Sequence, residues 1–555
     1  NLANCLRMID TAQADSPQLL VLPEFCNHIS WYDDAEHAWA VSVELEGEFL
    51  GEIAARAQKY GCYIVINVSL RRDPGEITVT SLCYDPQGRL CASADKQTLM
   101  GHENTWFVRA RQTGEVVDAP FGRFAMFPCR DGVTCETPRA LALRGAQLFC
   151  DSLNSFALDE ASLHVPARAP ENKVFLVAAN KVGPLIPEHL LEPVSEQTHI
   201  PLQFLNGAGE SQIVDPDGKV LAKGPREGEA VVIADIELYL ANNKTRPDGT
   251  DLFESRRPWL YQAIAQEPQG LVCGPAAEEI TVACLSPEYQ GERALAELPG
   301  LVQALPQDTA LAVLPELFCH EPSSQAGDEA RALLGEMAID AMQDACAQRP
   351  GLALCASIYR RADAGVGVTA VLVDTNGLIS GQPRLHGTAG DEASTLGDKL
   401  SLVDMPWGRL AIMSGHDAIF PELIKVAAIQ GAHVLALPSR FLEDWEEAYG
   451  LRSRAAENRL CVVASSWPLN NRAGLIADLE SEFTLMTEWK ERRFDGYINV
   501  PLVTEQRPGE TVTVARIHPA AASDKLMSER TDLILDRPWR LSGDLLLSAK
   551  ELQNG

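Results

Sequence analysis

Two residues that can take part in covalent chemistry each stand at the end of a short apolar run. Cys129 follows RFAMFP and precedes a polar turn and a predicted helix over 136–143, and Glu24 follows QLLVLP. An apolar run bounded by turn residues predicts a buried strand. A cysteine on a tight turn between a strand and a helix is where α/β enzymes place a nucleophile. The competing interpretation of Cys129 is a small buried hydrophobic residue, as most free cysteines are.

The stretch around Glu24 occurs twice in the 555-residue sequence. QLLVLPEFCNH recurs as LAVLPELFCHE around Glu316, DAPFGR at 118–123 recurs as DMPWGR at 404–409, and RAPENKVFLVAAN recurs as RAAENRLCVVASS. The offset between the pairs drifts from 280 to 292 residues. Such a pattern indicates two tandem copies of one domain, with insertions and deletions in the loops.

The repeat predicts the domain boundaries. We expect residues 1–268 to form the first copy, residues 278–545 the second copy, and residues 546–555 a C-terminal tail, with the junction in the Pro- and Gly-rich stretch 266–277. The second copy opens with an apolar run, ITVACLSP, that has no counterpart in the first. We therefore expect the first strand of the first copy to precede residue 1 in the native protein.

Short apolar runs alternate with helical stretches in each copy. In the first copy the predicted strands include CYIVINVSL, RFAMFP, AQLFCDS, VFLVAAN and AVVIADIEL, and the predicted helices include FLGEIAARAQKY and ETPRALALR. Hairpin signals such as DPQG join some of the strands. This mixture predicts an α/β fold with sheets covered by helices.

Composition excludes several classes of partner. A net charge of −30 argues against nucleic acid and anionic membranes as partners, and no apolar run approaches the ~20 residues of a membrane helix. The 14 cysteines lack CxxC pairs and compact spacing. This pattern disfavours a zinc site or a disulfide framework and favours a reducing compartment, so we expect the cytoplasm.

Taken in order, these motifs resemble the nitrilase superfamily of carbon–nitrogen hydrolases over nearly the whole chain, twice. Members carry a Glu after an LPE-type strand, a Lys before a variable loop and a Cys in a C-x-D/E turn, and here these are Glu24, Lys96 and Cys129. Further family positions are matched after the nucleophile and in the R-A-x-E-N segment, by Asp131, Glu136, Arg139, Arg168, Glu171 and Asn172. Thr134 and Cys135 replace the usual Phe-Pro of the family.

The resemblance implies an α-β-β-α sandwich that commonly dimerises, so two fused copies imply an intramolecular pseudo-dimer. It also implies a cysteine-dependent hydrolase that needs no metal and no organic cofactor. Glu24 would act as the general base for the Cys129 thiol. Lys96 and the backbone N–H of Arg130 would stabilise the negative charge that develops on the substrate.

Three further residues are candidates for the site. Glu103 fits a second family glutamate that follows the lysine, and it would orient Lys96 or position the substrate or water. Trp106 and Phe107 are candidate substrate-binding residues, with a place in the core as the alternative. Arg168 and Glu171 are interpreted as an internal structural pair.

The second copy keeps the scaffold motifs and loses the chemistry. Gly415 takes the place of the nucleophile, and Arg384 the place of the lysine, whereas Glu316 is kept. A general base without a nucleophile cannot run covalent catalysis. We therefore expect a pseudoenzyme copy that completes a dimer-like interface.

The leading functional interpretation is a hydrolase of a small non-peptide C–N bond, in an amide or a carbamoyl compound. The alternative is a true nitrilase, because Lys96, Glu103 and Trp106 also fit the nitrilase spacing. An acyl transferase and, from another class, a non-catalytic scaffold or binding protein stay open. The expected partner is a small-molecule amide, carbamoyl compound or nitrile, and homo-oligomers beyond the pseudo-dimer stay open too.

Overall fold

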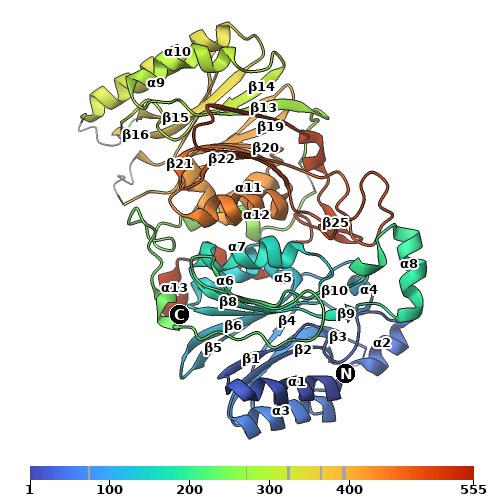
Figure 1. Cartoon of the computed structure of the whole chain (residues 1–555). Coiled ribbons are helices and arrows are strands. Elements are labelled where there is room, and N and C mark those ends of the chain that lie inside the picture. The colour runs from blue at the N-terminus through green and yellow to red at the C-terminus, as the bar shows by residue number, and fades with distance from the viewer. Residues whose placement is uncertain (73–74, 271, 322–325, 363–364, 390–394, 555) are drawn as a thin grey trace. The chain divides into compact units, whose positions relative to one another are not determined.

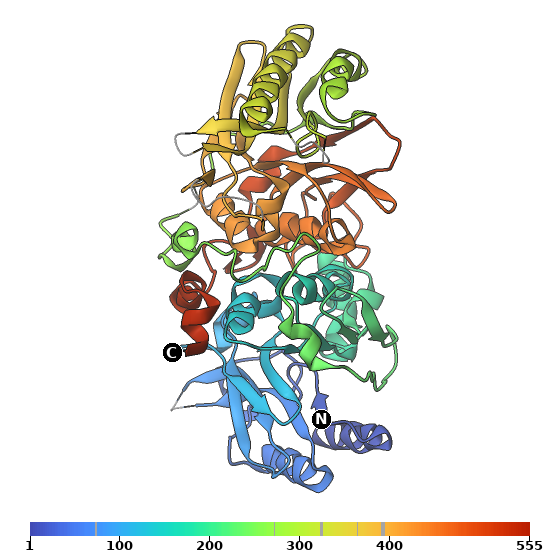
Figure 2. The ribbon, with the colours of Figure 1, turned by 90° about the vertical axis from the view of Figure 1, so that its left-hand side faces the viewer.

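The computed structural model of the chain describes residues 1–72, 75–270, 272–321, 326–362, 365–389 and 395–554. The chain divides into two compact units. Unit 1 comprises residues 1–244, 482–499 and 526–555, and unit 2 comprises residues 245–481 and 500–525. The first helix and the last helix of the chain therefore both belong to unit 1 (Figures 1 and 2).

Unit 1 contains two larger sheets. The four-stranded sheet has the order β1 (Leu19–Val21), β2 (Tyr63–Arg71), β3 (Ile77–Tyr84) and β4 (Leu90–Asp95). The six-stranded sheet has the order β12 (Val220–Lys223), β11 (Gln212–Val214), β8 (Phe175–Ala179), β7 (Leu148–Ser152), β6 (Gly122–Pro128) and β5 (Val116–Ala119). Strands β6, β7 and β8 are parallel, so their carboxyl ends meet at one edge.

The core of unit 1 lies between these sheets and under the helices. Side chains from both sheets form one buried cluster, with Val65, Cys83, Met126, Leu148 and Phe175 among its members. Helices α1 (Leu2–Ala12) and α3 (Glu48–Tyr60) pack on the four-stranded sheet. Helices α5 (Arg130–Val133), α6 (Glu136–Leu143) and α7 (Val165–Asn172) cover the six-stranded sheet (Figure 1).

Unit 2 also contains two larger sheets. One has the order β17 (Gly377–Pro383), β16 (Gly365–Asp374), β15 (Ala353–Ala362), β14 (Thr309–Val313), β13 (Ile280–Leu285) and β24 (Val512–Ile517). The other has the order β18 (Leu402–Met405), β19 (Gly408–Ile412), β20 (Val434–Ser439), β21 (Cys461–Leu469), β22 (Arg472–Asp478) and β23 (Leu502–Gln506). Helices α9 (Glu292–Gln303) and α10 (Asp328–Ala347) pack on the first sheet, and α11 (Pro421–Ile429) and α12 (Leu451–Asn458) pack together beside the second.

Shorter elements complete the chain. They are α2 (Ala35–Val41), α4 (Glu103–Trp106), α8 (Leu191–Thr198), β9 (Val182–Pro184), β10 (Asn206–Ala208), β25 (Leu526–Ser528), β26 (Thr531–Asp532) and α13 (Ala549–Asn554), with several single-turn helices. The η11 helix (Trp539–Leu546), a 3-10 helix of eight residues, also belongs to unit 1. Within the described ranges, none of the helices has the length and apolar character needed to cross a membrane.

The α/β class predicted from the sequence is confirmed, and so are most of its elements. The runs CYIVINVSL, RFAMFP, AQLFCDS and VFLVAAN correspond to β2, β6, β7 and β8, and ITVACL forms β13. The predicted strand AVVIADIEL is wrong, because residues 230–237 form no ladder with any described strand. An apolar extended segment becomes a strand only when a partner strand pairs with it, and sequence patterns do not show the partner.

The compact units differ from a simple division of the sequence into halves. Residues 245–265 pack within unit 2, and residues 526–545 pack within unit 1. In unit 2, the Arg256 guanidinium lies 2.8 Å from the Glu422 carboxylate on α11, and both side chains are fully buried. The domain boundaries at 268 and 278 follow the sequence repeat and stay a prediction, and residue 271 of the junction lies outside the described residues.

Candidate active site

The carboxylates of Glu24 and Glu103 meet the ammonium group of Lys96 at the carboxyl end of β1. Lys96 Nζ lies 2.8 Å from Glu24 Oε1 and 2.9 Å from Glu103 Oε1. All three residues are at least 95% buried. A buried cation is stable only when opposite charges and hydrogen bonds replace its water, and here two carboxylates do so. The structure thus brings together three of the residues predicted from the sequence.

Cys129 lies on a strained turn directly after β6. Its φ of +42° and ψ of −99° place it in a region that side chains rarely adopt. Its backbone N–H donates to the Ser152 carbonyl and to Asp151 Oδ1, both at 3.0 Å, so the end of β7 fixes the strained residue. Backbone strain of this kind costs of order 1–3 kcal/mol and collects at active sites. Cys129 thus lies on a strained turn between a strand and a helix, and its role as a nucleophile stays a prediction.

The charges at this end of the sheets shift the pKa values of the base and the nucleophile. Burial raises the pKa of Glu24 to about 7, although Lys96 counteracts the effect, and the charge of Glu103 adds to the rise. Desolvation of the sulfur, and then the charge of Glu24, raise the pKa of the Cys129 thiol well above its ordinary value. Burial alone would lower the pKa of Lys96, but Glu103 and Glu24 hold it well above its ordinary value. The sulfur therefore carries its proton at neutral pH.

Asp131 positions the segment that carries Lys96. Its two carboxylate oxygens accept the backbone N–H groups of Gln97 and Thr98, at 2.8 and 2.9 Å. Asp131 follows Cys129 by two residues, so one turn holds the sulfur and fixes the position of the ammonium. Sequence reasoning matched Asp131 to a family motif but gave it no role, because a carboxylate that accepts backbone N–H groups leaves no side-chain pattern.

The predicted charge-stabilising group, the backbone N–H of Arg130, begins helix α5. The first backbone N–H groups of a helix have no acceptor within the helix. A role of this N–H in stabilising a developing negative charge stays a prediction. Helix α5 is held from behind by Arg168, which donates to the carbonyls of Gly132 (2.8 Å) and Val133 (2.9 Å). Arg168 also pairs with Glu171 at 2.5 Å, which confirms their interpretation as an internal pair.

Trp106 and Phe107 lie in an aromatic cluster behind Phe25. The Phe107 ring centroid is 5.8 Å from that of Phe25 and 5.5 Å from that of Tyr32, and Phe107 is buried. Trp106 is partly buried at the edge of the same cluster. Phe25 follows Glu24 directly in the chain, so the packing of this cluster around Phe25 helps to fix the backbone next to Glu24. A direct role in substrate binding stays a prediction for both residues.

Sequence reasoning missed three residues around Cys129 and Glu24. The backbone of Asn154 interacts with the Cys129 thiol and partly offsets the rise of its pKa. Burial raises the pKa of Glu160, in the turn before α7, to about 8, and this carboxyl interacts electrostatically with Cys129 and Glu24. The Lys181 ammonium, just after β8, lies 6.0 Å from the centre of the Phe25 ring and interacts with Glu24. All three residues follow β7 or β8 in the chain. Their position just after a buried apolar run is the signal in the sequence that could have identified them.

Unit 2 holds a related arrangement without the sulfur. Arg384 pairs with Glu316, and the backbone N–H groups of Leu385 and His386 donate to Asp417. These contacts parallel those of Lys96, Glu24 and Asp131 in unit 1. A Cβ built at Gly415 would lie 2.3 Å from Ser439 Oγ, so no side chain fits at this position without a shift of the backbone.

Comparison with known proteins gives one family. Residues 1–243 match the family described as carbon–nitrogen hydrolase. The chain is 28% identical to a nitrilase of Pyrococcus abyssi over 262 residues, which is 47% of this chain and 92% of that protein. It is 27% identical to a bifunctional nitrilase/nitrile hydratase of Lupinus angustifolius over 214 residues, which is 37% of this chain and 60% of that protein. The chain thus spans less than two thirds of the plant relative.

Among solved structures, one similar chain is the NitN amidase from Nesterenkonia sp. AN1. It is 24% identical in sequence, and the TM-score is 0.36. The alignment covers 44% of this chain and 89% of the amidase.

Proposed function

We propose that this chain, whose residues 1–243 belong to the carbon–nitrogen hydrolase family, hydrolyses a small non-peptide C–N bond through a thioester on Cys129. The preferred substrate class is an amide or a carbamoyl compound. The observation that carries the proposal is the Lys96 ammonium between the carboxylates of Glu24 and Glu103, with Cys129 on a strained turn of the same unit.

The first half of the reaction forms the thioester. Glu24 accepts the proton of the Cys129 thiol while the sulfur attacks the carbonyl carbon. The carbonyl π electrons move to oxygen, and the negative charge is stabilised by Lys96 and the backbone N–H of Arg130. When the carbonyl re-forms, the C–N bond breaks, and Glu24 gives its proton to the departing ammonia or amine.

The second half hydrolyses the thioester. Glu24 accepts a proton from a water molecule, the resulting hydroxide adds to the thioester carbon, and the C–S bond breaks. The acid leaves, and the proton returns from Glu24 to the sulfur of Cys129. Glu103 keeps Lys96 oriented through both halves. A pKa of about 7 suits Glu24 to this work, because a group that both takes and gives a proton works best near the operating pH.

A true nitrilase is the second candidate, and the Pyrococcus and Lupinus relatives, both named for nitrile chemistry, favour it. The same residues serve attack on a nitrile carbon. Ammonia release from a panel of amides, carbamoyl amines and nitriles decides between the two. Turnover of nitriles alone would overturn the preferred class, and turnover of no panel member would favour the scaffold interpretation.

Cysteine reactivity gives a test that needs no substrate. If Cys129 is the nucleophile and Glu24 takes its proton, iodoacetamide should label it faster than the other thirteen cysteines, all of which are free thiols, even though burial raises the pKa of Cys129. Cys129→Ala should abolish turnover while the circular dichroism spectrum stays unchanged. Equal labelling of all exposed thiols would contradict the proposed role.

For the architecture, we infer two tandem α-β-β-α copies that form an intramolecular pseudo-dimer, with a catalytically inactive second copy. Contacts at positions paired by the repeat support the inference. Lys244 Nζ donates to the carbonyls of Asn172 and Lys173, and Lys525 Nζ donates to those of Asn458 and Arg459, all at 2.7–3.0 Å. Mass measurement of the native protein in solution would reveal any further oligomer. A cytoplasmic location stays a prediction from the cysteine pattern.

A further inference from the structure

The turn that carries Glu103 fixes the aim of its carboxylate. Glu103 Oε1 meets Lys96 Nζ at 2.9 Å, and Glu103 Oε2 accepts the backbone N–H of Met100 at 2.8 Å. The distance from carboxylate to ammonium therefore depends on the backbone of residues 99–104. A displacement of this turn by about 1 Å would break the charged hydrogen bond, because such bonds weaken steeply beyond ~3.2 Å.

Two hydroxyl groups from the last part of the chain hold this turn. Thr531 Oγ1 donates to the carbonyl of Leu99 at 2.8 Å and accepts the backbone N–H of Gly101 at 3.1 Å. Ser528 Oγ accepts the same N–H at 2.9 Å. Thr531 is fully buried and Ser528 is 3% exposed, so water does not readily replace these bonds.

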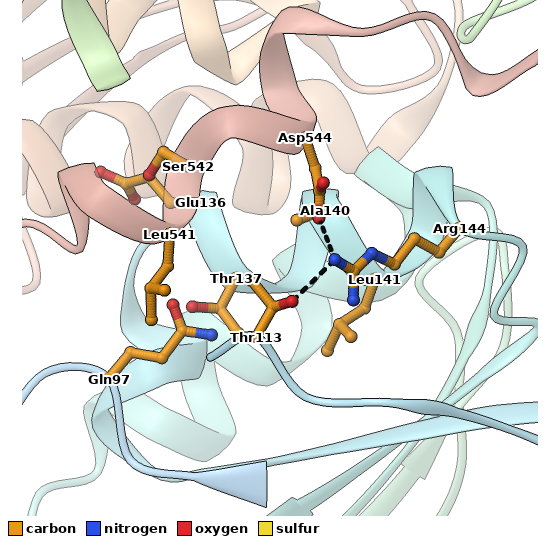
Figure 3. Close-up of a pocket in the computed structure, with 10 residues that line it drawn as sticks. All are labelled: Gln97, Thr113, Glu136, Thr137, Ala140, Leu141, Arg144, Leu541, Ser542 and Asp544. Carbon is orange, nitrogen blue, oxygen red and sulfur yellow. Dashed lines mark hydrogen bonds and ion pairs between the residues drawn. The ribbon is translucent and has the colours of Figure 1, made fainter. Parts of the chain in front are cut away.

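Further contacts anchor the segment 526–546 in the same unit. Arg109 Nη2 lies 2.9 Å from Asp536 Oδ1 and 3.1 Å from Asn104 Oδ1. It therefore links Asn104, at the end of the turn, to the segment 526–546. Arg144, which caps the C-terminal end of α6, pairs with Asp544 of η11 at 2.7 Å. Figure 3 shows this ion pair beside a cavity of about 10 Å³, enough for about one water molecule. These ion pairs fix the segment 526–546 against the rest of unit 1. None of the proposed catalytic residues lines the small cavity.

We propose that Thr531 and Ser528 are positioning residues of the active site. They hold the turn that aims Glu103 at Lys96, so the terminal segment of the predicted second copy completes the site of the first. The inference rests on the proposed function, since it assigns these hydroxyls to the same reaction. On this inference, the last residues of the predicted inactive copy belong to the catalytic unit.

The test uses the full-length chain with matched variants. Thr531→Val keeps the shape of the side chain and removes the hydroxyl, and Thr531→Ser restores the hydroxyl. The control is Thr250→Val, because Thr250 begins the same T-D-L sequence in the other copy and is equally buried, in unit 2. Thr250 Oγ1 has no hydrogen-bond partner among the described residues. We expect Thr531→Val to lower kcat/KM about 10- to 100-fold, Thr531→Ser to recover most of it, and Thr250→Val to leave it unchanged.

A pH profile separates positioning from general loss of structure. The charge of Glu103 raises the pKa of Glu24, so a displaced Glu103 should move the acidic limb of the profile to lower pH. The limb is measured by the rate of Cys129 alkylation with iodoacetamide, which requires no turnover. A wild-type protein that turns over no panel substrate would overturn the proposed function, while the alkylation profile would still decide the positioning role.

Three outcomes of the alkylation and activity measurements would overturn the inference. An unshifted alkylation profile in Thr531→Val, or an equal effect of Thr250→Val, would contradict it, as would a failure of Thr531→Ser to restore the profile. If Thr531→Val does not fold, Ser528→Ala removes a single acceptor and tests the same contact. Ser528→Ala should shift the limb in the same direction by a smaller amount, and an unshifted limb in this variant would also overturn the inference.

Discussion

Ser439 occupies the space that a side chain at Gly415 would need. A Cβ at Gly415 would lie 2.3 Å from Ser439 Oγ and 2.6 Å from its Cα. At Gly415 the backbone of the neighbouring strand β20 therefore leaves no room for a side chain. The arginine that replaces the lysine, paired with Glu316, completes the change.

This relationship predicts that Gly415→Cys creates no second active site. In a Cys129→Ala background the variant should show no turnover, since the new side chain cannot enter without a backbone shift. The same clash should lower the melting temperature, because forced overpacking of a core costs about 1–3 kcal/mol. Differential scanning fluorimetry and the ammonia assay measure both effects. Measurable turnover in the double variant would contradict the prediction.

The pKa of Glu24 predicts the acidic limb of activity. Glu24 must be ionised to take the thiol proton, and its pKa is about 7. As pH falls below about 7, the base becomes protonated, so kcat/KM should fall about tenfold per pH unit. Glu103→Gln removes a charge that raises this pKa, so its limb should lie at lower pH. Glu44→Gln, at an exposed ion pair with Arg71, is the control and should leave the limb in place.

Asp131→Asn should impair catalysis without loss of the fold. The amide keeps the shape of the carboxylate but presents only one oxygen to the N–H groups of Gln97 and Thr98. Lys96 is then less well fixed, and kcat should fall about 10- to 100-fold with a smaller change in KM. Asp215→Asn is the matched control, because Asp215 likewise accepts two backbone N–H groups, in an exposed hairpin turn. Equal effects of the two variants would argue against a specific role for Asp131.

Arg168→Met should destabilise the protein strongly. The change removes the buried ion pair with Glu171 and two bonds to the carbonyls of α5, and the breaking of a buried pair typically costs about 3–5 kcal/mol. Arg516→Met breaks an exposed pair with Glu279 and should cost less than about 1 kcal/mol. The midpoints of urea unfolding measure both. Similar midpoints for the two variants would contradict the structural role of Arg168.

Whether a site residue could be predicted from the sequence depends on the kind of contact that its side chain makes. Glu24 and Cys129 could be singled out because each follows a short apolar run that forms a strand, and Lys96 because a family motif surrounds it. Asp131 and Asp151 act by accepting backbone N–H groups, and such bonds depend on where two chain segments meet rather than on residue type. The strand wrongly predicted at 230–237 has the same cause, since its apolar run could be seen in the sequence and its lack of a partner strand could not.

The contact between Thr531 and Leu99 spans 432 residues of sequence. During synthesis, the first 244 residues of unit 1 leave the ribosome long before the segment that steadies the Glu103 turn. Contacts of such high sequence separation form late and slow the final stage of folding. A chain that stops short of residue 526 would therefore carry a complete set of reactive side chains without the segment that aligns them. If Thr531 and Ser528 have the proposed positioning role, the site should reach its full rate only after residues 526–531 have been synthesised and packed against the Glu103 turn.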